Sequence, residues 1–172
     1  GAEKAVSDYR LILDNPDIQA VFVLVGHHLH SRFTTEVLAA GKHVFVEKPL
    51  AINEEQLAEV FAAYEKQGLD SRLRRNDNKI NGNVKVSNGA DHGQMVMVGF
   101  NRRFSPHTVK IRELLAGRSE PLTMTMTVNA GFIPVEHWTQ DPERGGGRII
   151  GEGCHFIDLL SFLANSPVAS VS

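Results

Sequence analysis

An acidic residue, a lysine and a proline follow directly behind a short apolar run in this sequence. The stretch VFVEKPLA, residues 44–51, places Glu47, Lys48 and Pro49 at the end of a predicted strand. The carboxyl ends of the strands in an open parallel sheet are where such sheets hold ligands and reactive groups. A lysine there can act as a general acid and base, with Glu47 holding its ammonium group and Pro49 fixing the bend. A solvated lysine behind a strand is the alternative interpretation.

Three histidines stand close together behind another apolar run, in the stretch GHHLH at residues 26–30. Imidazole is a common zinc ligand, but this spacing is not a standard zinc pattern, and no cysteine or carboxylate cluster adjoins it. We therefore expect no metal site. Gly26, His27, His28 and His30 are interpreted as a loop at the end of a strand, in which one or two histidines contact a ligand.

A third stretch, GGGRIIGEGCHFIDLL at residues 145–160, combines glycines with titratable groups. It is not a G-x-G-x-x-G motif and it follows a polar loop, so its glycines are interpreted as a tight turn with close packing. Glu152, His155 and Asp158 lie at i, i+3 and i+6 of a predicted helix, so His155 can share a face with either carboxylate. This spacing leaves a structural and a catalytic pair open. Cys154 points about 100° away from its neighbour on a helix and is interpreted as a packed thiol.

The elements that must position these residues follow from the apolar pattern. Expected strands lie at 21–25, 44–46 and 95–100, and expected helices at 32–40 and 57–67. The uniformly apolar run at 21–25 is typical of a strand covered on both faces. Asn53 and Gln56 match a capping box at the start of the second helix. This alternation predicts a doubly wound α/β layer.

The remaining segments differ from this pattern. Residues 69–93 are rich in Asn, Asp, Gly and Arg, and we expect a long exposed loop or a partly disordered insertion. Helices are expected from Pro106 to about Leu115 and over 153–163. Residues 121–130 alternate threonine with apolar residues, which predicts a half-covered strand, and another strand is expected at 168–172. The alternating strand predicts a second, more antiparallel region that begins near residue 118.

Composition excludes several functional classes. The 172 residues include 18 basic and 20 acidic ones, for a net charge of −2, so we expect neither nucleic acid nor an anionic membrane as a partner. One cysteine excludes an internal disulfide framework. No apolar stretch reaches the roughly 18 residues of a membrane span, and the cytoplasm is the expected location.

Four stretches together resemble the Gfo/Idh/MocA oxidoreductases, the family of glucose-fructose oxidoreductase and inositol 2-dehydrogenase. They are DNPDIQAVFVLVGHHLHS, AAGKHVFVEKPLAINEEQL, MVGFNRRFSPH and GGGRIIGEGCHFIDLL. The resemblance implies an incomplete Rossmann-like parallel sheet with helices over residues 1–117, with the insertion at 69–93, that binds NAD or NADP. It implies the start of an α/β substrate domain with a mostly antiparallel sheet over residues 118–172.

The resemblance also implies roles for individual residues. Hydride would pass between a carbinol carbon of a sugar or cyclitol and the nicotinamide, while Lys48 and His155 handle the hydroxyl proton. Many members carry an aspartate four residues before this histidine; Gly151 stands there, so either the adjacent Glu152 substitutes or the relay is shorter. The expected cofactor contacts are Gly26, His27, His28, His30, Glu47, Lys48 and Pro49, and the expected substrate contacts are Arg103, Trp138 and Asp158.

Two functions remain open. The first is part of an NAD(P)-dependent sugar or cyclitol oxidoreductase, with the glycine-rich phosphate loop expected upstream of residue 1 and little activity expected from these residues alone. The second is a truncated, non-catalytic scaffold that acts as a binding or self-associating module. In both cases exposed sheet edges and apolar surface predict a homo-oligomer, with exchanged segments as one arrangement.

Overall fold

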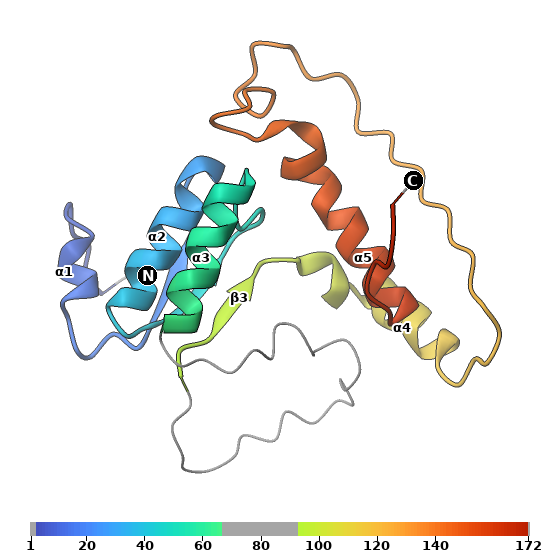
Figure 1. Cartoon of the computed structure of the whole chain (residues 1–172), viewed down its shortest axis with the longest axis horizontal. Helices are drawn as coiled ribbons and strands as arrows, with labels where there is room; N and C mark the ends of the chain where they lie inside the picture. Colours follow the sequence, from blue (N-terminus) through green and yellow to red (C-terminus); the bar gives the residue numbers. More distant parts are fainter. Residues whose placement is uncertain (1–2, 67–92, 172) are drawn as a thin grey trace. The chain divides into compact units, whose positions relative to one another are not determined.

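The computed structural model of the protein describes residues 3–66 and 93–171, which fall into two compact units (Figure 1). Within these ranges, the first unit comprises residues 3–66 and 93–99, and the second comprises residues 100–171. The chain thus divides after Gly99, earlier than the boundary expected near residue 118. The functional assignment of the domains stays a prediction. The loop or insertion expected at 69–93 lies outside the described residues except for Gly93.

A three-stranded parallel sheet forms the centre of the first unit. Its strands β1 (Ala20–Val23), β2 (His43–Val46) and β3 (Val96–Val98) are ordered β1-β2-β3. Val21 pairs with Val44, which in turn pairs with Val96. β-Branched residues suit a pleated, buried surface, which is why these short runs form strands. The expected parallel α/β layer is confirmed.

Two helices, α2 (His30–Ala39) and α3 (Glu54–Lys66), lie side by side on one face of this sheet (Figure 1). The core consists of apolar side chains from the sheet and from α2: Val23, Val44, Val46, Val37 and Leu38. The opposite face is apolar but open, because Phe22 of β1 is 66% exposed and Met97 of β3 is 48% exposed. The prediction that the first strand is covered on both faces is therefore wrong for the described residues, whose helices α2 and α3 cover one face.

The start of α3 confirms the predicted capping box. The side-chain oxygen of Asn53 accepts a hydrogen bond from the backbone N–H of Gln56 at 2.9 Å. The Gln56 side chain accepts one from the backbone N–H of Ile52 at 3.1 Å, one residue earlier than in the standard motif. A short helix, α1 (Arg10–Leu13), precedes β1.

The second unit is helical where the structure describes regular elements. It contains the 3₁₀ turn η3 (Asn101–Phe104), α4 (Pro106–Leu115), the π-helical turn η4 (Ile149–Gly153) and α5 (Cys154–Ala164). Ser105 caps α4, since its hydroxyl accepts a hydrogen bond from the backbone N–H of Thr108 at 3.2 Å. Both expected helices of this region are confirmed.

The strands expected at 121–130 and 168–172 are wrong over the residues described there. Residues 121–130 and 168–171 form no strand, and the antiparallel sheet that the resemblance implies is not seen in the described part of this unit. The alternation is real, because Leu122, Met124 and Met126 are half-buried between exposed neighbours. A strand also requires a hydrogen-bonding neighbour, however, and the described part of the second unit pairs none with this segment.

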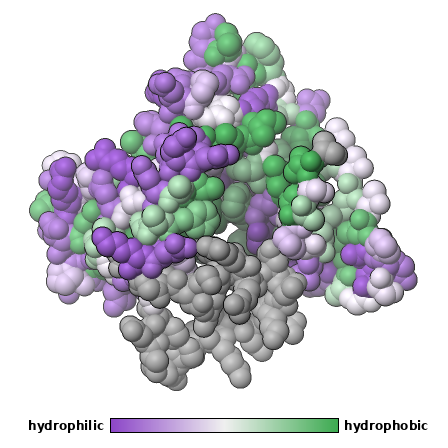
Figure 2. All heavy atoms as spheres, in the orientation of Figure 1, coloured by the Kyte–Doolittle hydropathy of each residue, from purple (hydrophilic) through white to green (hydrophobic). Residues whose placement is uncertain are grey.

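The surface carries many apolar side chains. Figure 2 shows them at the surface among polar ones. Examples of high exposure are Phe132 at 89% and Leu114 at 74%, both in the second unit. Among the described residues, no helix is long and apolar enough to cross a membrane.

Candidate functional site at the carboxyl edge of the sheet

The parallel strands bring two of the three chemically rich stretches to one edge of the first unit. Because β1, β2 and β3 run in the same direction, their carboxyl ends meet there. β1 leads into Gly26 and the 3₁₀ turn η1 (His27–Leu29), while β2 leads into Glu47, Lys48 and Pro49. The edge is therefore built from a histidine-rich loop and from a turn that contains a glutamate, a lysine and a proline.

Backbone hydrogen bonds hold these strand ends in line. The N–H of Glu47 donates to the carbonyl of Val23 at 3.1 Å, and the N–H of Gly99 donates to the carbonyl of Val46 at 2.8 Å. The ladder therefore extends past the last strand residue of both β2 and β3. The first residues of each following loop are fixed by the sheet.

His30 joins the two loops through its side chain. It is the first residue of α2 and is 1% exposed. Its Nδ1 lies 2.7 Å from the carbonyl oxygen of Pro49, and its Nε2 lies 2.9 Å from the carbonyl oxygen of Val25. The end of β1 and the turn after β2 are thus tied to one imidazole ring.

Glu47 and Lys48 lie half-buried at this edge, and the peptide bond between Lys48 and the buried Pro49 is cis. The carboxylate of Glu47 lies over the backbone of Gly99, because a Cβ atom at Gly99 would be 3.0 Å from Oε2 of Glu47. A side chain at position 99 would also lie 3.1 Å from the ring of Phe45. Sequence reasoning missed Gly99. The available signal was a glycine directly behind a strand, which often marks a close approach.

The histidines of the loop differ in their surroundings. His28 is half-buried, and its Nδ1 is buried without a hydrogen-bond partner among the described residues. Its ring lies against Gly26, where a Cβ atom would be 3.2 Å from Cε1 of His28. The ring of His27 lies 5.7 Å from that of His30, measured between centroids. A buried polar atom without a partner is costly, so Nδ1 of His28 is a point where a ligand can add a hydrogen bond.

The third stretch lies in the second unit. His155, in the first turn of α5, is 9% exposed, and the ring of Phe100 lies edge-on 6.1 Å from it. Glu152 is in the π-helical turn η4 and accepts a hydrogen bond from Arg148 at 3.0 Å. Asp158 accepts two hydrogen bonds from Arg103, one from Nε at 2.7 Å. Each of the two carboxylates flanking His155 in the sequence therefore has a guanidinium partner.

The glycine-rich turn before η4 is confirmed as a device for tight packing. A Cβ atom at Gly145 would lie 2.5 Å from the Cα of Thr139, which leaves no room for a side chain. Gly146 and Gly147 have φ angles of 77° and 75°, which favour glycine. Trp138 precedes this turn, is 39% exposed and has its ring 5.9 Å from that of His137.

The predicted site residues are thus divided between the units. Lys48 and the histidine loop belong to the first unit, whereas His155 and the bonded pair of Arg103 and Asp158 belong to the second. Within the second unit the structure pairs two of the three expected substrate contacts with each other. The roles of these residues stay predictions.

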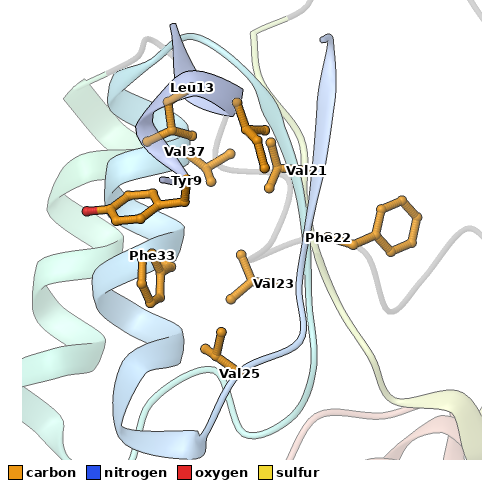
Figure 3. A pocket seen from close by; sticks show the side chains of 9 residues that line it. Tyr9, Leu13, Val21, Phe22, Val23, Val25, Phe33 and Val37 are labelled. Atoms are coloured by element: carbon orange, nitrogen blue, oxygen red, sulfur yellow. The ribbon is translucent and has the colours of Figure 1, made fainter. Parts of the chain in front are cut away.

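An apolar groove of about 160 Å³ lies beside β1 (Figure 3). Side chains of α1, β1 and α2 line it, among them Leu13, Val21 and Val37. Figure 3 shows Phe22 on the other side of β1 from Val21 and Val23, as the alternation of a strand requires. β1 is an edge strand of the described sheet, so this groove runs along an open edge.

Comparison with known proteins gives this geometry a context. Residues 1–72 match the Gfo/Idh/MocA family, described as an oxidoreductase family with an NAD-binding Rossmann fold. The chain is 28% identical over 181 residues to the uncharacterized oxidoreductase YrbE of Bacillus subtilis. This match covers 98% of this chain and 42% of that protein. It is 28% identical over 173 residues to 1,5-anhydro-D-fructose reductase of Ensifer adhaerens, covering 98% of this chain and 44% of that protein.

Two further similarities concern cyclitols and sugars. The chain is 25% identical to inositol 2-dehydrogenase/D-chiro-inositol 3-dehydrogenase of Lactiplantibacillus plantarum, covering 95% of this chain and 39% of that protein. Among solved structures, levoglucosan dehydrogenase in complex with NADH and levoglucosan superposes with a TM-score of 0.64 at 24% identity, covering 95% of this chain and 39% of that one. This structural likeness shows the fold. The chain therefore spans about two fifths of the length of these relatives, and the predicted family resemblance is confirmed.

Proposed function

We propose, from the premise that residues 1–72 match the Gfo/Idh/MocA oxidoreductase family, that the protein containing this chain oxidises or reduces a sugar or cyclitol at a hydroxyl-bearing carbon. The observation that carries the proposal is the Glu47-Lys48-Pro49 turn at the carboxyl edge of a parallel sheet. The names of the relatives, which include an anhydrofructose reductase and an inositol dehydrogenase, support the substrate class.

The histidine loop fits a cofactor contact. Gly26 lets the backbone lie close to the ring of His28, and Nδ1 of His28 is buried without a partner among the described residues. A bound NAD or NADP would supply hydride transfer at its nicotinamide ring. We assign Gly26, His27 and His28 to the loop that touches the cofactor, together with the turn after β2.

Lys48 is the proposed proton-transfer group. Its Nζ would take the proton from the substrate hydroxyl during oxidation and return it during reduction. Glu47, fixed by the backbone bond to Val23 and by the space over Gly99, would keep a negative charge beside that ammonium group. The buried Pro49 would fix the direction of the turn.

His155 is the second proposed proton-transfer group, and the second unit would also bind the substrate. We assign Arg103, Asp158 and Trp138 to substrate contacts. Support comes from the bonded pair of Arg103 and Asp158, which offers guanidinium donors and carboxylate acceptors suited to sugar hydroxyls. Glu152 is the proposed carboxylate near His155, with Arg148 as its present partner.

A second candidate function is a non-catalytic, self-associating module. One observation favours it: the open face of the described sheet exposes Phe22 at 66% and Leu24 at 64%. Apolar area of this kind is typical of a surface that another protein surface covers. In this case Lys48 would be a residue inherited from the family without a present catalytic role.

The test is a titration of the complete protein that contains this chain with NAD(H) and NADP(H), followed by calorimetry and by nicotinamide fluorescence. The proposed function predicts saturable binding, and a preference between the two cofactors would give the cofactor choice. Lys48→Ala should abolish hydride transfer to a panel of sugars and inositols in the complete protein. Lys110→Ala is the matched control, because Lys110 is exposed on α4 and pairs with Glu113. Equal activity of the Lys48→Ala and Lys110→Ala variants would contradict the role of Lys48.

A further inference from the structure

The two contacts of His30 are unusual for a neutral imidazole. Both ring nitrogens face backbone carbonyl oxygens, at 2.7 Å for Pro49 and 2.9 Å for Val25. Carbonyl oxygens only accept hydrogen bonds, and a neutral histidine carries one N–H. In either neutral tautomer one nitrogen would therefore direct its lone pair at a carbonyl oxygen within 3 Å.

Turning the ring does not remove this conflict. A rotation of 180° about the Cβ–Cγ bond replaces both nitrogens with carbons and loses both hydrogen bonds. The doubly protonated ring donates at both positions, and hydrogen bonds from a charged donor are the stronger kind. Burial opposes the positive charge, since His30 is 1% exposed. The two carbonyl acceptors offset this penalty.

We propose that His30 is held in its doubly protonated form and is a positioning residue for the turn at residues 47–49. As an imidazolium ion it clamps the carbonyl of Pro49 to the carbonyl of Val25, so the turn after β2 is fixed relative to the end of β1. The clamp itself does not depend on any ligand. Its consequence for proton transfer, through the placement of Lys48, rests on the proposed function.

The charged and titratable groups around His30 come from three elements. On η1, His27 has its ring 5.7 Å away, and His28 is its neighbour. The turn after β2 carries Glu47 and Lys48 next to the contacted Pro49. On α2 itself, Arg32 and Glu36 pair with each other at 2.8 Å.

The protonation state can be read directly. Long-range proton–nitrogen correlation spectra of the ¹⁵N-labelled chain distinguish the two neutral tautomers from the imidazolium ion for each histidine. We expect the imidazolium pattern for His30 in spectra recorded at about pH 7, because both ring nitrogens face carbonyl oxygens. His30→Gln identifies its signal by loss, and His107→Gln, an exposed histidine on α4, is the control. A spectrum with one protonated nitrogen on His30 at that pH overturns the clamp.

The positioning role has its own readout. A glutamine at position 30 can donate to one of the two carbonyls but not to both, so the turn should open more often. We expect amide exchange at Glu47 and Lys48 to be at least about tenfold faster in His30→Gln than in His107→Gln, as befits the loss of one charge-assisted hydrogen bond. Equal exchange in both variants overturns the positioning role. If His30→Gln does not fold, the spectrum of the unsubstituted chain still decides the protonation state.

The outcome for the clamp is separable from the outcome for the function. An imidazolium signal, together with no binding of NAD(H) or NADP(H) by the complete protein, would uphold the clamp and contradict the proposed function. Cofactor binding with a neutral His30 would uphold the function and overturn the clamp.

Discussion

Gly99 leaves room for the carboxylate of Glu47 at the carboxyl edge of the sheet. A Cβ atom at Gly99 would lie 3.0 Å from Oε2 of Glu47 and 3.1 Å from the ring of Phe45, so both neighbours would have to shift. We expect Gly99→Ala to lower the free energy of unfolding by about 1–2 kcal/mol, the range of a mildly overpacked site. Urea unfolding measures this change. Gly153→Ala is the control and should cost nothing, because a Cβ atom there would have only ordinary contacts, the nearest at 3.7 Å.

Glu36 on α2 links stability to pH. Burial on its own raises the pKa of Glu36, but hydrogen bonds from Tyr9 and Arg32, with the positive charges of Arg32 and Arg10, outweigh it and lower the pKa below its ordinary value of 4.5. A lowered pKa in the folded state gives stability that is present above pH 4.5 and is lost as the pH falls through the folded-state pKa. The effect is small, because this side chain is 31% exposed and solvent screens the pair.

The variant that isolates this contribution is Glu36→Gln. We expect it to lower the free energy of unfolding near neutral pH by less than about 1 kcal/mol, with the difference from the parent chain vanishing in acid. Urea unfolding over a pH series measures both. A difference that is constant with pH would show that packing, not charge, is responsible.

Lys48 could be located from the sequence, because the apolar run 44–46 before it predicts a strand and Pro49 after it predicts a bend. Sequence reasoning could not assign His30 to its two backbone carbonyls, since those contacts join residues 5 and 19 positions apart and depend on how the loops fold back. The family resemblance placed His30 among the cofactor contacts, and that role stays a prediction. Its burial and its two carbonyl contacts are visible from the structure alone.

The helix α5 begins behind a π-helical turn, and this element changes how its charged residues are arranged. The i, i+3, i+6 spacing of Glu152, His155 and Asp158 presumed a regular α-helix, whereas Glu152 lies in η4. The two carboxylates face different arginines, Arg148 and Arg103. The apolar spacing predicts the helix, but it does not distinguish the i→i+5 hydrogen bonding of the π-helical turn from that of a regular α-helix.

The pair of Arg103 and Asp158 ties η3 to α5. The side chain of Asp158 is 8% exposed and that of Arg103 is 28% exposed, so removing the arginine leaves a largely buried carboxylate. We expect Arg103→Ala to lower the free energy of unfolding by roughly 2 kcal/mol, less than for a fully buried pair because solvent reaches the guanidinium. Lys110→Ala breaks an exposed pair on α4 and should cost less than about 0.5 kcal/mol. A double-mutant cycle of Arg103→Ala with Asp158→Ala would give a coupling near zero if the bond is unimportant.

Strand prediction succeeded for β1, β2 and β3 and failed at 121–130 for one physical reason. The β-branched residues of β1, β2 and β3 favour strands, and each of these strands has a parallel partner within the same unit. The alternating segment has the period of a strand but no hydrogen-bonding neighbour in the part of the second unit that the structure describes. The apolar period of a segment indicates which of its faces is buried. Strand pairing also requires a second segment that offers backbone hydrogen bonds.

At the scale of the whole molecule, the open face of the sheet predicts self-association. Phe22 is stacked on Phe45 at 5.0 Å between ring centroids and remains 66% exposed. We expect sedimentation to show a dimer or larger species and Phe22→Glu to shift it toward the monomer. Phe132→Glu is the control, because Phe132 is 89% exposed but lies in the second unit. A monomer at all concentrations, or an equal effect of both variants, would contradict an interface on this face.

The order of the strands along the chain has a consequence for how the edge assembles during folding. β1 and β2 are joined by η1 and α2, whereas the contact between Met95 and His43 at the start of β3 spans 52 positions. Bringing distant residues together lowers the chain entropy before their contact can stabilise the fold. Strands that are distant in the sequence therefore pair late. β3 is also the strand that brings Gly99 beneath Glu47. The surroundings of the lysine turn are therefore completed by the most distant strand pairing of this sheet, and a nascent or partly unfolded chain would hold Lys48 without its support.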